Sequence, residues 1–221
     1  PVMSSLVAGS YFSHRGSLTN AYCLAQNATW RHTSKSRQGG AELYESEFQT
    51  GVAGDGVTNR EVPCADCRVE NAFIEQTLYG AAECPSGWEE LYNGTVYASR
   101  YNHNREEYQC VPDDDAMMDP QGSGSVNQDG RLFYQAELKG FGPWSGIVDG
   151  KTLGCRKYVS QRGNTPFVIW GKSQCPSGDS EWNSKLMYKG EMGGSRRDHS
   201  GGGSNFLCVA RDARNGTFAA Q

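Results

Sequence analysis

Apolar residues occur along this chain in short stretches, each bounded by Gly, Pro, Asn or Ser. The stretches are rich in Val, Tyr, Phe and Trp, which favour pleated strands. The predicted strands are Glu42–Gln49, Asn71–Tyr79, Leu91–Tyr101, Glu107–Pro112, Arg131–Leu138, Pro166–Lys172, Lys185–Lys189 and Asn205–Arg211, with a further apolar stretch at Val2–Phe12. No stretch keeps helical periodicity over three turns. The pattern predicts an all-β protein of short strands and many turns.

One segment of the sequence is repeated. Cys84–Cys110 begins with Cys-Pro-Ser-Gly and is repeated in altered form at Cys175–Cys208, and its second half is similar to Val7–Cys23. Cys84 and Cys175 are 91 residues apart, and so are Cys64 and Cys155. This spacing predicts tandem β repeats of about 90 residues, out of phase with the ends of the chain.

The spacing divides the chain into residues 1–70, a truncated first repeat, residues 71–160, a complete second repeat, and residues 161–221, a partial third repeat. Residues 166–190 supply the opening segment that the first repeat lacks. They either fold back within their own chain or insert into a neighbouring chain by strand addition, which gives a ring or a filament. The remaining alternative is a monomer whose last segment forms a small extra half-unit.

The composition of the 221-residue chain limits the classes of partner that we expect. It holds 28 Gly, 11% aromatic residues and 37% hydrophobic residues, and its formal net charge is −4. This charge gives no electrostatic reason to expect a nucleic-acid partner. No apolar run approaches the length of a transmembrane helix, so we expect no membrane insertion. The sequence opens Pro-Val-Met-Ser, and we expect a mature, processed chain.

The cysteines and the sequons indicate the compartment. The eight cysteines are Cys23, Cys64, Cys67, Cys84, Cys110, Cys155, Cys175 and Cys208. Only Cys64 and Cys67 have Cys-x-x-Cys spacing, so we favour disulfides over a zinc site, and a structural role for this pair over a redox dithiol. N-glycosylation sequons begin at Asn27, Asn93 and Asn215. Together these features predict a secreted, extracellular glycoprotein.

Several cysteine contexts are similar to those of a known family. They are VIWGK at 168–172, Cys175-Pro176, PCADC at 63–67, CPSGW at 84–88, YQCVP at 108–112 and GRLFY at 130–134. They resemble the noncollagenous domain of the short-chain, spongin-type collagens of sponges and related invertebrate proteins. The chain departs from that pattern at Tyr158, where a second cysteine would stand, and it has no Gly-x-y collagen tract. The resemblance implies a secreted, disulfide-bonded, self-associating matrix domain without enzymatic activity.

Analogy between the copies suggests two disulfides. They join Cys84 with Cys110 and Cys175 with Cys208, among the 105 pairings that eight cysteines allow.

Three histidines occupy the same place in the three copies. His14 and His199 stand nine residues before a cysteine, and His103 stands seven before. A histidine in a Gly-rich loop can bind a metal or a sugar hydroxyl, or it can hold the loop together by hydrogen bonds. We favour the structural role, and the alternative is a site where the copies meet.

Other side chains are candidates for surface contacts. Trp144 stands in a loop and is a candidate for a ligand-contact surface, whereas we expect Trp88 and Trp170 in the core. The acidic cluster that begins at Asp113 is a possible calcium site, but we favour a solvated loop, because no EF-hand pattern is present. We interpret Glu106 and its neighbour Glu107 as ordinary exposed residues.

No catalytic motif stands in the sequence: there is no G-x-S-x-G, no H-E-x-x-H and no P-loop. We expect no enzyme and no cofactor. The predicted function is that of a secreted structural glycoprotein that assembles as a homo-oligomer or head-to-tail polymer, in contact with glycans or other matrix proteins. The first alternative is a lectin-like carbohydrate-binding protein, with sites in the histidine loops. The second is a carrier of an apolar small molecule or pigment.

Overall fold

The computed structural model describes residues 5–15, 19–25, 42–49, 58–80, 84–113, 129–140, 150–163, 165–176 and 184–210. This part of the chain is all-β, with eleven strands and no helix, which confirms the expected fold class. The repeat of about 90 residues and the division into 1–70, 71–160 and 161–221 stay predictions. Within the described ranges, no helix is long and apolar enough to cross a membrane.

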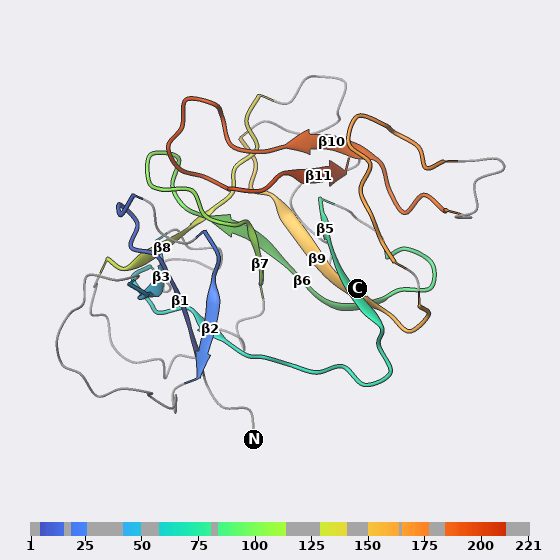
Figure 1. Cartoon of the computed structure of the whole chain (residues 1–221), viewed down its shortest axis with the longest axis horizontal. Coiled ribbons are helices and arrows are strands. Elements are labelled where there is room, and N and C mark those ends of the chain that lie inside the picture. The colour runs from blue at the N-terminus through green and yellow to red at the C-terminus, as the bar shows by residue number, and fades with distance from the viewer. Residues whose placement is uncertain are drawn as a thin grey trace.

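The strands join in one large mixed sheet (Figure 1). They are β1 (Ser5–Gly9), β2 (Tyr22–Ala25), β3 (Tyr44–Phe48), β4 (Pro63–Cys64), β5 (Ile74–Tyr79), β6 (Glu89–Ala98), β7 (Gln109–Pro112), β8 (Arg131–Gln135), β9 (Gly154–Ser160), β10 (Gly190–Gly193) and β11 (Leu207–Ala210). Their order across the sheet is β10-β11-β5-β9-β6-β8-β3-β1-β2, and β4 and β7 lie off this path on β1 and β6.

Strand β6 is the centre of one group of four strands. It pairs antiparallel with β7, with β8 and with β9. In these pairings Cys110 of β7 lies opposite Val96, and Cys155 of β9 lies opposite Gly94. The two cysteines therefore approach β6 from its two sides, two residues apart along the strand.

Strand β1 is the centre of a second group with the same arrangement. It pairs antiparallel with β2, β3 and β4. Cys23 of β2 lies opposite Val7, and Cys64 of β4 lies opposite Ser5. The two groups join where β3 and β8 run parallel, with Phe48 opposite Phe133.

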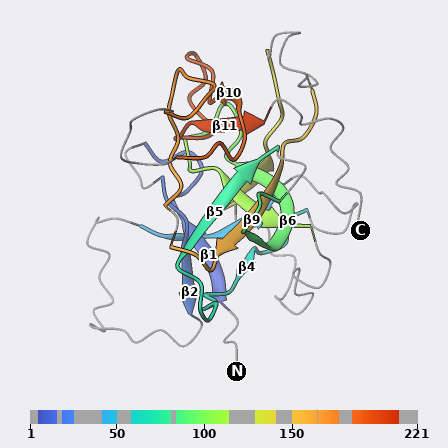
Figure 2. The same ribbon diagram turned by 90° about the vertical axis from the view of Figure 1, so that its right-hand side faces the viewer.

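The β10–β11 hairpin is the third element of this kind. Cys208 of β11 lies opposite Met192 of β10, as Cys110 lies opposite Val96. The hairpin joins the rest of the sheet through a parallel pairing of Val209 with Tyr79 of β5. Figures 1 and 2 show it at the end of the molecule opposite the β1–β2 hairpin.

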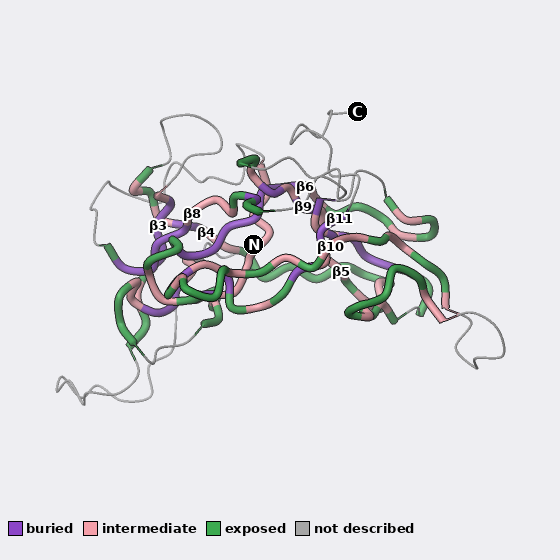
Figure 3. The backbone as a smooth tube through the Cα atoms, turned by 90° about the horizontal axis from the view of Figure 1, so that it is seen from above, coloured by how far each residue is buried: buried purple, intermediate pink, exposed green. Residues whose placement is uncertain are grey.

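The core consists of three clusters that cross the boundaries between these strand groups. One cluster packs Val96 and Cys155 of the β6 group against Val209 of β11. Another packs Phe48 of β3 against Phe133 of β8. The third combines Leu78 of β5, Tyr158 of β9 and Ala210 of β11. Figure 3 shows the buried segments along the interior strands and the exposed segments at the periphery. Each cluster thus combines residues from different strand groups and holds these groups together.

Candidate functional site

The loops that follow β1, β6 and β10 carry the three predicted histidines and pack against one another in a row. The Asn104 N–H donates a 3.0 Å hydrogen bond to the Phe12 carbonyl, which joins the first loop to the second. The Gly201 N–H donates a 2.8 Å hydrogen bond to the Tyr101 carbonyl, which joins the second to the third. The sequence predicted equivalent histidine loops, and the structure brings them together as one surface.

The first two histidines have matching aromatic neighbours. The His14 ring lies 5.6 Å from the Tyr44 ring at an interplanar angle of 76°, and the His103 ring lies 5.6 Å from the Tyr134 ring at 77°. His103 also packs on Phe12, at 4.7 Å between ring centroids. Edge-to-face contacts of this kind stabilise packing between loops. The two rings therefore pack between loops, and the hydrogen-bonding role that we favoured for His14 and His103 stays a prediction.

His199 is placed differently from the other two histidines. Its ring lies 5.1 Å from that of Tyr101, which is 54% exposed, and the Arg100 guanidinium lies 5.6 Å from the same Tyr101 ring. The Arg105 side chain donates a 3.3 Å hydrogen bond to the His199 carbonyl. This end of the loop row therefore presents an aromatic ring to solvent beside a cation.

The environment of His103 disfavours its charged form. Burial lowers the pKa of the His103 imidazole below its ordinary value, and the nearby Arg100 guanidinium lowers it further. Its Nδ1 atom is buried and has no hydrogen-bond partner. In the described ranges, no group of three His, Cys, Asp or Glu side chains could hold a metal ion.

A buried ion pair lies next to the second histidine loop. The Arg131 Nε donates to Glu106 Oε2 at 2.8 Å, and the two side chains are 1% and 3% exposed. The guanidinium lies 4.6 Å from the Phe133 ring centroid. Gly9 leaves room for it, because a Cβ at that position would be 2.5 Å from Arg131 Cδ. Our interpretation of Glu106 as an exposed residue is therefore wrong.

The Arg131–Glu106 pair connects two of the histidine loops, and its guanidinium has N–H donors that lack a hydrogen-bond partner. Glu106 forms a parallel bridge with Gly203 of the third loop, and its N–H donates a 3.0 Å hydrogen bond to the Gly202 carbonyl. Burial raises the pKa of the Glu106 carboxyl, and the Arg131 guanidinium, which lowers it, offsets this only in part. Arg131 Nη1 and Nη2 are buried without hydrogen-bond partners. Nothing in the spacing of Glu106 and Arg131 could have indicated this pair.

Four cysteines form two disulfides, Cys23–Cys64 and Cys110–Cys155. The expected Cys84–Cys110 bond is wrong, because Cys110 bonds instead to Cys155 on the far side of β6. The expected Cys175–Cys208 bond is not formed either, and both of these thiols are free. Disulfides persist in non-reducing environments, so the two bonds indicate such a compartment.

Of the four free thiols, two are exposed and two are half-buried. Cys67 and Cys84 are exposed, and Cys175 and Cys208 are half-buried. The Cys84 thiol donates a 3.0 Å hydrogen bond to the carbonyl of Trp88, which packs against the cluster that contains Tyr158. Burial is the main cause that raises the pKa of Tyr158 to about 12, and the Cys84 side chain is close enough to add to it. Cys84 therefore lies close to the cluster that contains Tyr158.

The remaining predicted residues are placed only in part. Trp144, Asn27 and Asn215 lie outside the described residues. Asn93 is half-buried on β6, and its glycosylation stays a prediction. Asp113, the described member of the acidic cluster, accepts a 2.8 Å hydrogen bond from the Thr95 hydroxyl.

Comparison of the chain with known protein families, with curated proteins and with solved structures finds no match. The functional argument therefore rests on the residues and contacts of this chain.

Proposed function

We propose that the protein is a secreted structural glycoprotein that self-associates into an extracellular matrix or filament assembly. The observation that carries this proposal is the way in which successive strand groups pack on one another. β3 pairs with β8, and β11 pairs with β5, in both cases in parallel between segments that come from different copies of the expected repeat. Contacts between copies of the expected repeat therefore already occur within the chain.

We infer that the chain is built from tandem β units of about 90 residues. Shared register supports this inference. Val7 opposite Cys23 corresponds to Val96 opposite Cys110 and to Met192 opposite Cys208. Ala8 opposite Glu45 likewise corresponds to Tyr97 opposite Gln135. Repeat units of this kind bury their apolar faces against neighbouring units rather than alone.

The first and last repeat units of such a chain have a neighbouring unit on one side only. Large apolar side chains are exposed on two segments that stand at corresponding unit boundaries. Val69 and Phe73 are 42% and 72% exposed, and Val168 and Trp170 are 43% and 49% exposed. Exposed apolar surface of this kind favours association with another protein surface. Together with the two disulfides, it supports an assembling protein of the extracellular space, as the resemblance to spongin-type noncollagenous domains also suggests.

Negative-stain microscopy of the full 221-residue chain, purified under oxidising conditions, tests this proposal. Rings, filaments or rows of subunits are the expected images. Single particles of one chain at every concentration would contradict the proposal. Variant V168D, at an exposed position of the boundary, is expected to shorten or abolish the rows, and variant G163A, in the same part of the chain, serves as the matched control.

A lectin-like function is the second candidate, and the exposed ring of Tyr101 favours it. Sugars stack on exposed aromatic rings, and the neighbouring Arg100 guanidinium and His199 supply hydrogen-bond donors. A glycan array tests it: binding that is lost in Y101A but kept in Y22A, another exposed tyrosine, would establish this function. Absence of binding to any glycan would rule it out.

A further inference from the structure

We propose that residues Thr165–Cys175 of one copy of this protein bind as an added strand along Cys64–Val69 of a second copy, and that Cys175 then forms a disulfide with Cys67 of the second copy. This inference rests on the proposed self-association and names the contact that produces it. It assigns a role to two free thiols and to a largely exposed segment that lies outside the eleven strands.

The template for this contact is the β5–β9 pairing inside the chain. β5 runs antiparallel to β9, from Ile74 opposite Ser160 to Tyr79 opposite Cys155. A shift of about 91 residues, the spacing of the expected repeat, places Thr165–Trp170 in the position of β5 and Cys64–Val69 in that of β9. Trp170 then lies opposite Cys64. Strand addition of this kind joins proteins by main-chain hydrogen bonds.

The glycines that follow β5 and Thr165–Trp170 also have similar backbone angles. Gly80 follows β5 with a φ of 67°, and Gly171 follows Trp170 with a φ of 81°. The Gly80 N–H donates a 2.8 Å hydrogen bond to the Gly154 carbonyl. Gly171 therefore has the backbone angle that turns the chain at Gly80. Its N–H would donate to the Pro63 carbonyl of the second copy, as the Gly80 N–H donates to that of Gly154.

The receiving edge has the exposure expected of a strand that lacks a neighbour. In β9, which lies between β5 and β6, Tyr158, Val159 and Ser160 are buried. The corresponding residues Cys67, Arg68 and Val69 are exposed and follow β4, which pairs with β1 at Pro63 and Cys64 in the register that Gly154 and Cys155 have on β6. An exposed edge beside a paired strand is a site where a further strand can add.

The donor segment Thr165–Trp170 is likewise more exposed than β5, its counterpart in the template. Leu78 of β5 is 1% exposed, whereas its counterpart Ile169 is half-buried. Val168 and Trp170, on either side of Ile169, are exposed, and the Trp170 ring lies 6.5 Å from that of Phe206. Our expectation that Trp170 lies in the core is therefore wrong. Thr165–Trp170 lies outside the eleven strands although its Val, Ile and Trp favour extended structure. Addition to a second copy would bury Ile169 in the position of Leu78.

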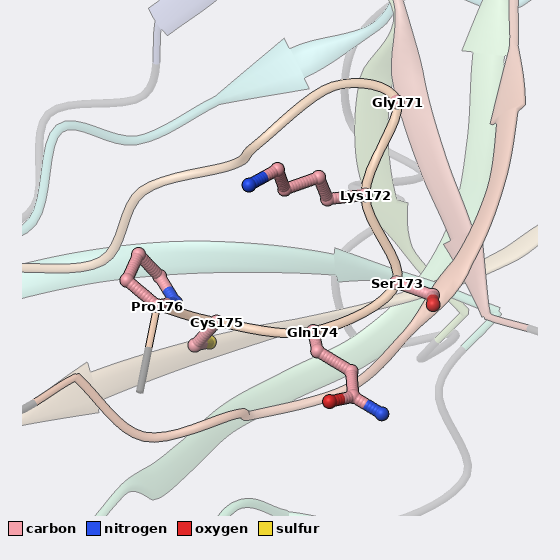
Figure 4. Close-up of a pocket in the computed structure, with 6 residues that line it drawn as sticks. All are labelled: Gly171, Lys172, Ser173, Gln174, Cys175 and Pro176. Carbon is pink, nitrogen blue, oxygen red and sulfur yellow. The ribbon is translucent and has the colours of Figure 1, made fainter. Parts of the chain in front are cut away.

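The position of the thiols follows from the same template. The Cys84 thiol bonds to the Trp88 carbonyl, and Trp88 packs on the cluster that contains Tyr158. A shift of about 91 residues places Cys175 at the position of Cys84 and Cys67 at that of Tyr158. Docking therefore brings the two thiols to the same part of the interface. Figure 4 shows Cys175 in an open hollow lined by Gly171–Pro176, with Lys172 pointing to the inside of this turn and Gln174 pointing away from it. Cys67 is exposed as well.

The bond forms by thiol–disulfide exchange. The thiolate of one cysteine attacks a small-molecule disulfide and releases one thiol, and the thiolate of the other cysteine then attacks the mixed disulfide and releases the second. Two protons leave the protein thiols, and the two electrons reduce the small-molecule disulfide to two thiols. Because the donor segment and the receiving segment are different parts of each copy, the contact is head-to-tail and continues until a ring closes.

The β10–β11 hairpin does not have to move for this contact. In the second copy, β1 already pairs with β4, the position that β6 takes on β9. Only Thr165–Cys175 is therefore required from the first copy, and β10–β11 remains paired with β5 of its own chain.

The test uses the full 221-residue chain, reduced and then oxidised with oxidised glutathione, on a non-reducing gel. We expect a ladder of linked chains, and a peptide that joins Cys67 to Cys175. Variants C67S and C175S should each lose the ladder, and an equimolar mixture of the two should form a linked dimer and nothing larger. Variant I169D should lose the ladder, whereas G163D, with its charge just outside the docking segment, should keep it.

Three results would overturn the inference. The first is a Cys67–Cys175 bond in a single chain, which would mean that the segment folds back on its own molecule. The second is a ladder linked through Cys84 or Cys208, and the third is a mixture of C67S and C175S that stays unlinked. Sedimentation of the C67S variant separates this inference from the proposed function. Assembly that persists in C67S and in I169D would leave the proposed function standing without this contact, and a wild-type monomer would contradict both.

Discussion

Cys110 and Cys155 are bonded across the strand that separates them. Cys110 lies opposite Val96 and Cys155 opposite Gly94, on the two sides of β6, and their Cα atoms are 5.9 Å apart. The other disulfide bears the same relation to β1. Each disulfide therefore locks three strands, and the core residues between them, into one group.

Removal of the Cys110–Cys155 bond should destabilise the protein strongly. The bond closes a loop of 45 residues, and the double variant C110S/C155S is expected to lose about 2–5 kcal/mol of the free energy of unfolding, measured by urea denaturation. C84S, which changes an exposed free thiol, is the control and should change it by less than about 0.5 kcal/mol. Peptide mapping that links Cys110 to Cys84 would refute this pairing.

Gly94 should not tolerate a side chain. A Cβ at this position would overlap the Val111 carbonyl of β7, whereas a Cβ at Gly163 would meet no atom within 4 Å. G94A is expected to cost about 1–3 kcal/mol in the free energy of unfolding, because β7 must move away from β6. G163A is the control and should be close to neutral. Equal stability of the two variants would mean that β7 does not pack on β6 as described.

The pair of Arg131 and Glu106 should be sensitive to the loss of one partner. E106L leaves the guanidinium buried without its carboxylate and is expected to cost about 3–5 kcal/mol in the free energy of unfolding. The double variant E106L/R131M should cost less than E106L alone, because no charge then remains buried. The exposed pair of Lys139 with Glu137 is the control, and E137Q should cost no more than about 1 kcal/mol. A double variant less stable than E106L would contradict this account.

His103 should make stability depend on pH. Burial, and to a smaller extent Arg100, lower the pKa of His103 in the folded protein, so the unfolded state binds this proton more readily below pH 6.5. The contribution is fully present above that pH and is lost as the pH falls toward the lowered pKa. Urea denaturation of wild type and H103Q at pH 7.5 and 5 measures it, and the difference isolates His103 from Glu106. The wild type should lose more stability than H103Q on acidification, and parallel losses would contradict the assignment.

The pattern of apolar residues predicted most of the strands but missed β2, β4, β9 and β10. The predicted strands at Asn71–Tyr79 and Arg131–Leu138 contain β5 and β8, and the predicted strand at Leu91–Tyr101 overlaps β6. β9 carries Arg156 and Lys157, which interrupt the apolar pattern. Each pairs at 2.8 Å with a glutamate on a neighbouring strand, Arg156 with Glu90 and Lys157 with Glu75. Such cross-strand pairing depends on the sheet order, which no single segment contains.

Two predicted strands, Pro166–Lys172 and Lys185–Lys189, are absent from the described part of the fold. Residue type favours a strand at Pro166–Lys172, but a strand also needs a neighbour with free main-chain groups, and the proposed neighbour belongs to a second copy.

The disulfide pairing and the burial of Glu106 could not be predicted for a related reason. Both depend on residues brought together by strands far apart in the sequence. The three histidine positions, by contrast, followed from the internal similarity, and their loops do pack together.

The measurement that tests the central claim most directly is the mass of the native protein in solution, determined by light scattering over a range of concentrations. One chain has a mass of 24.2 kDa. A self-associating subunit should give a mass of several chains that rises with concentration and falls when Val168 or Ile169 is replaced by Asp. A constant mass of one chain at all concentrations, with all four remaining thiols free, would contradict the account.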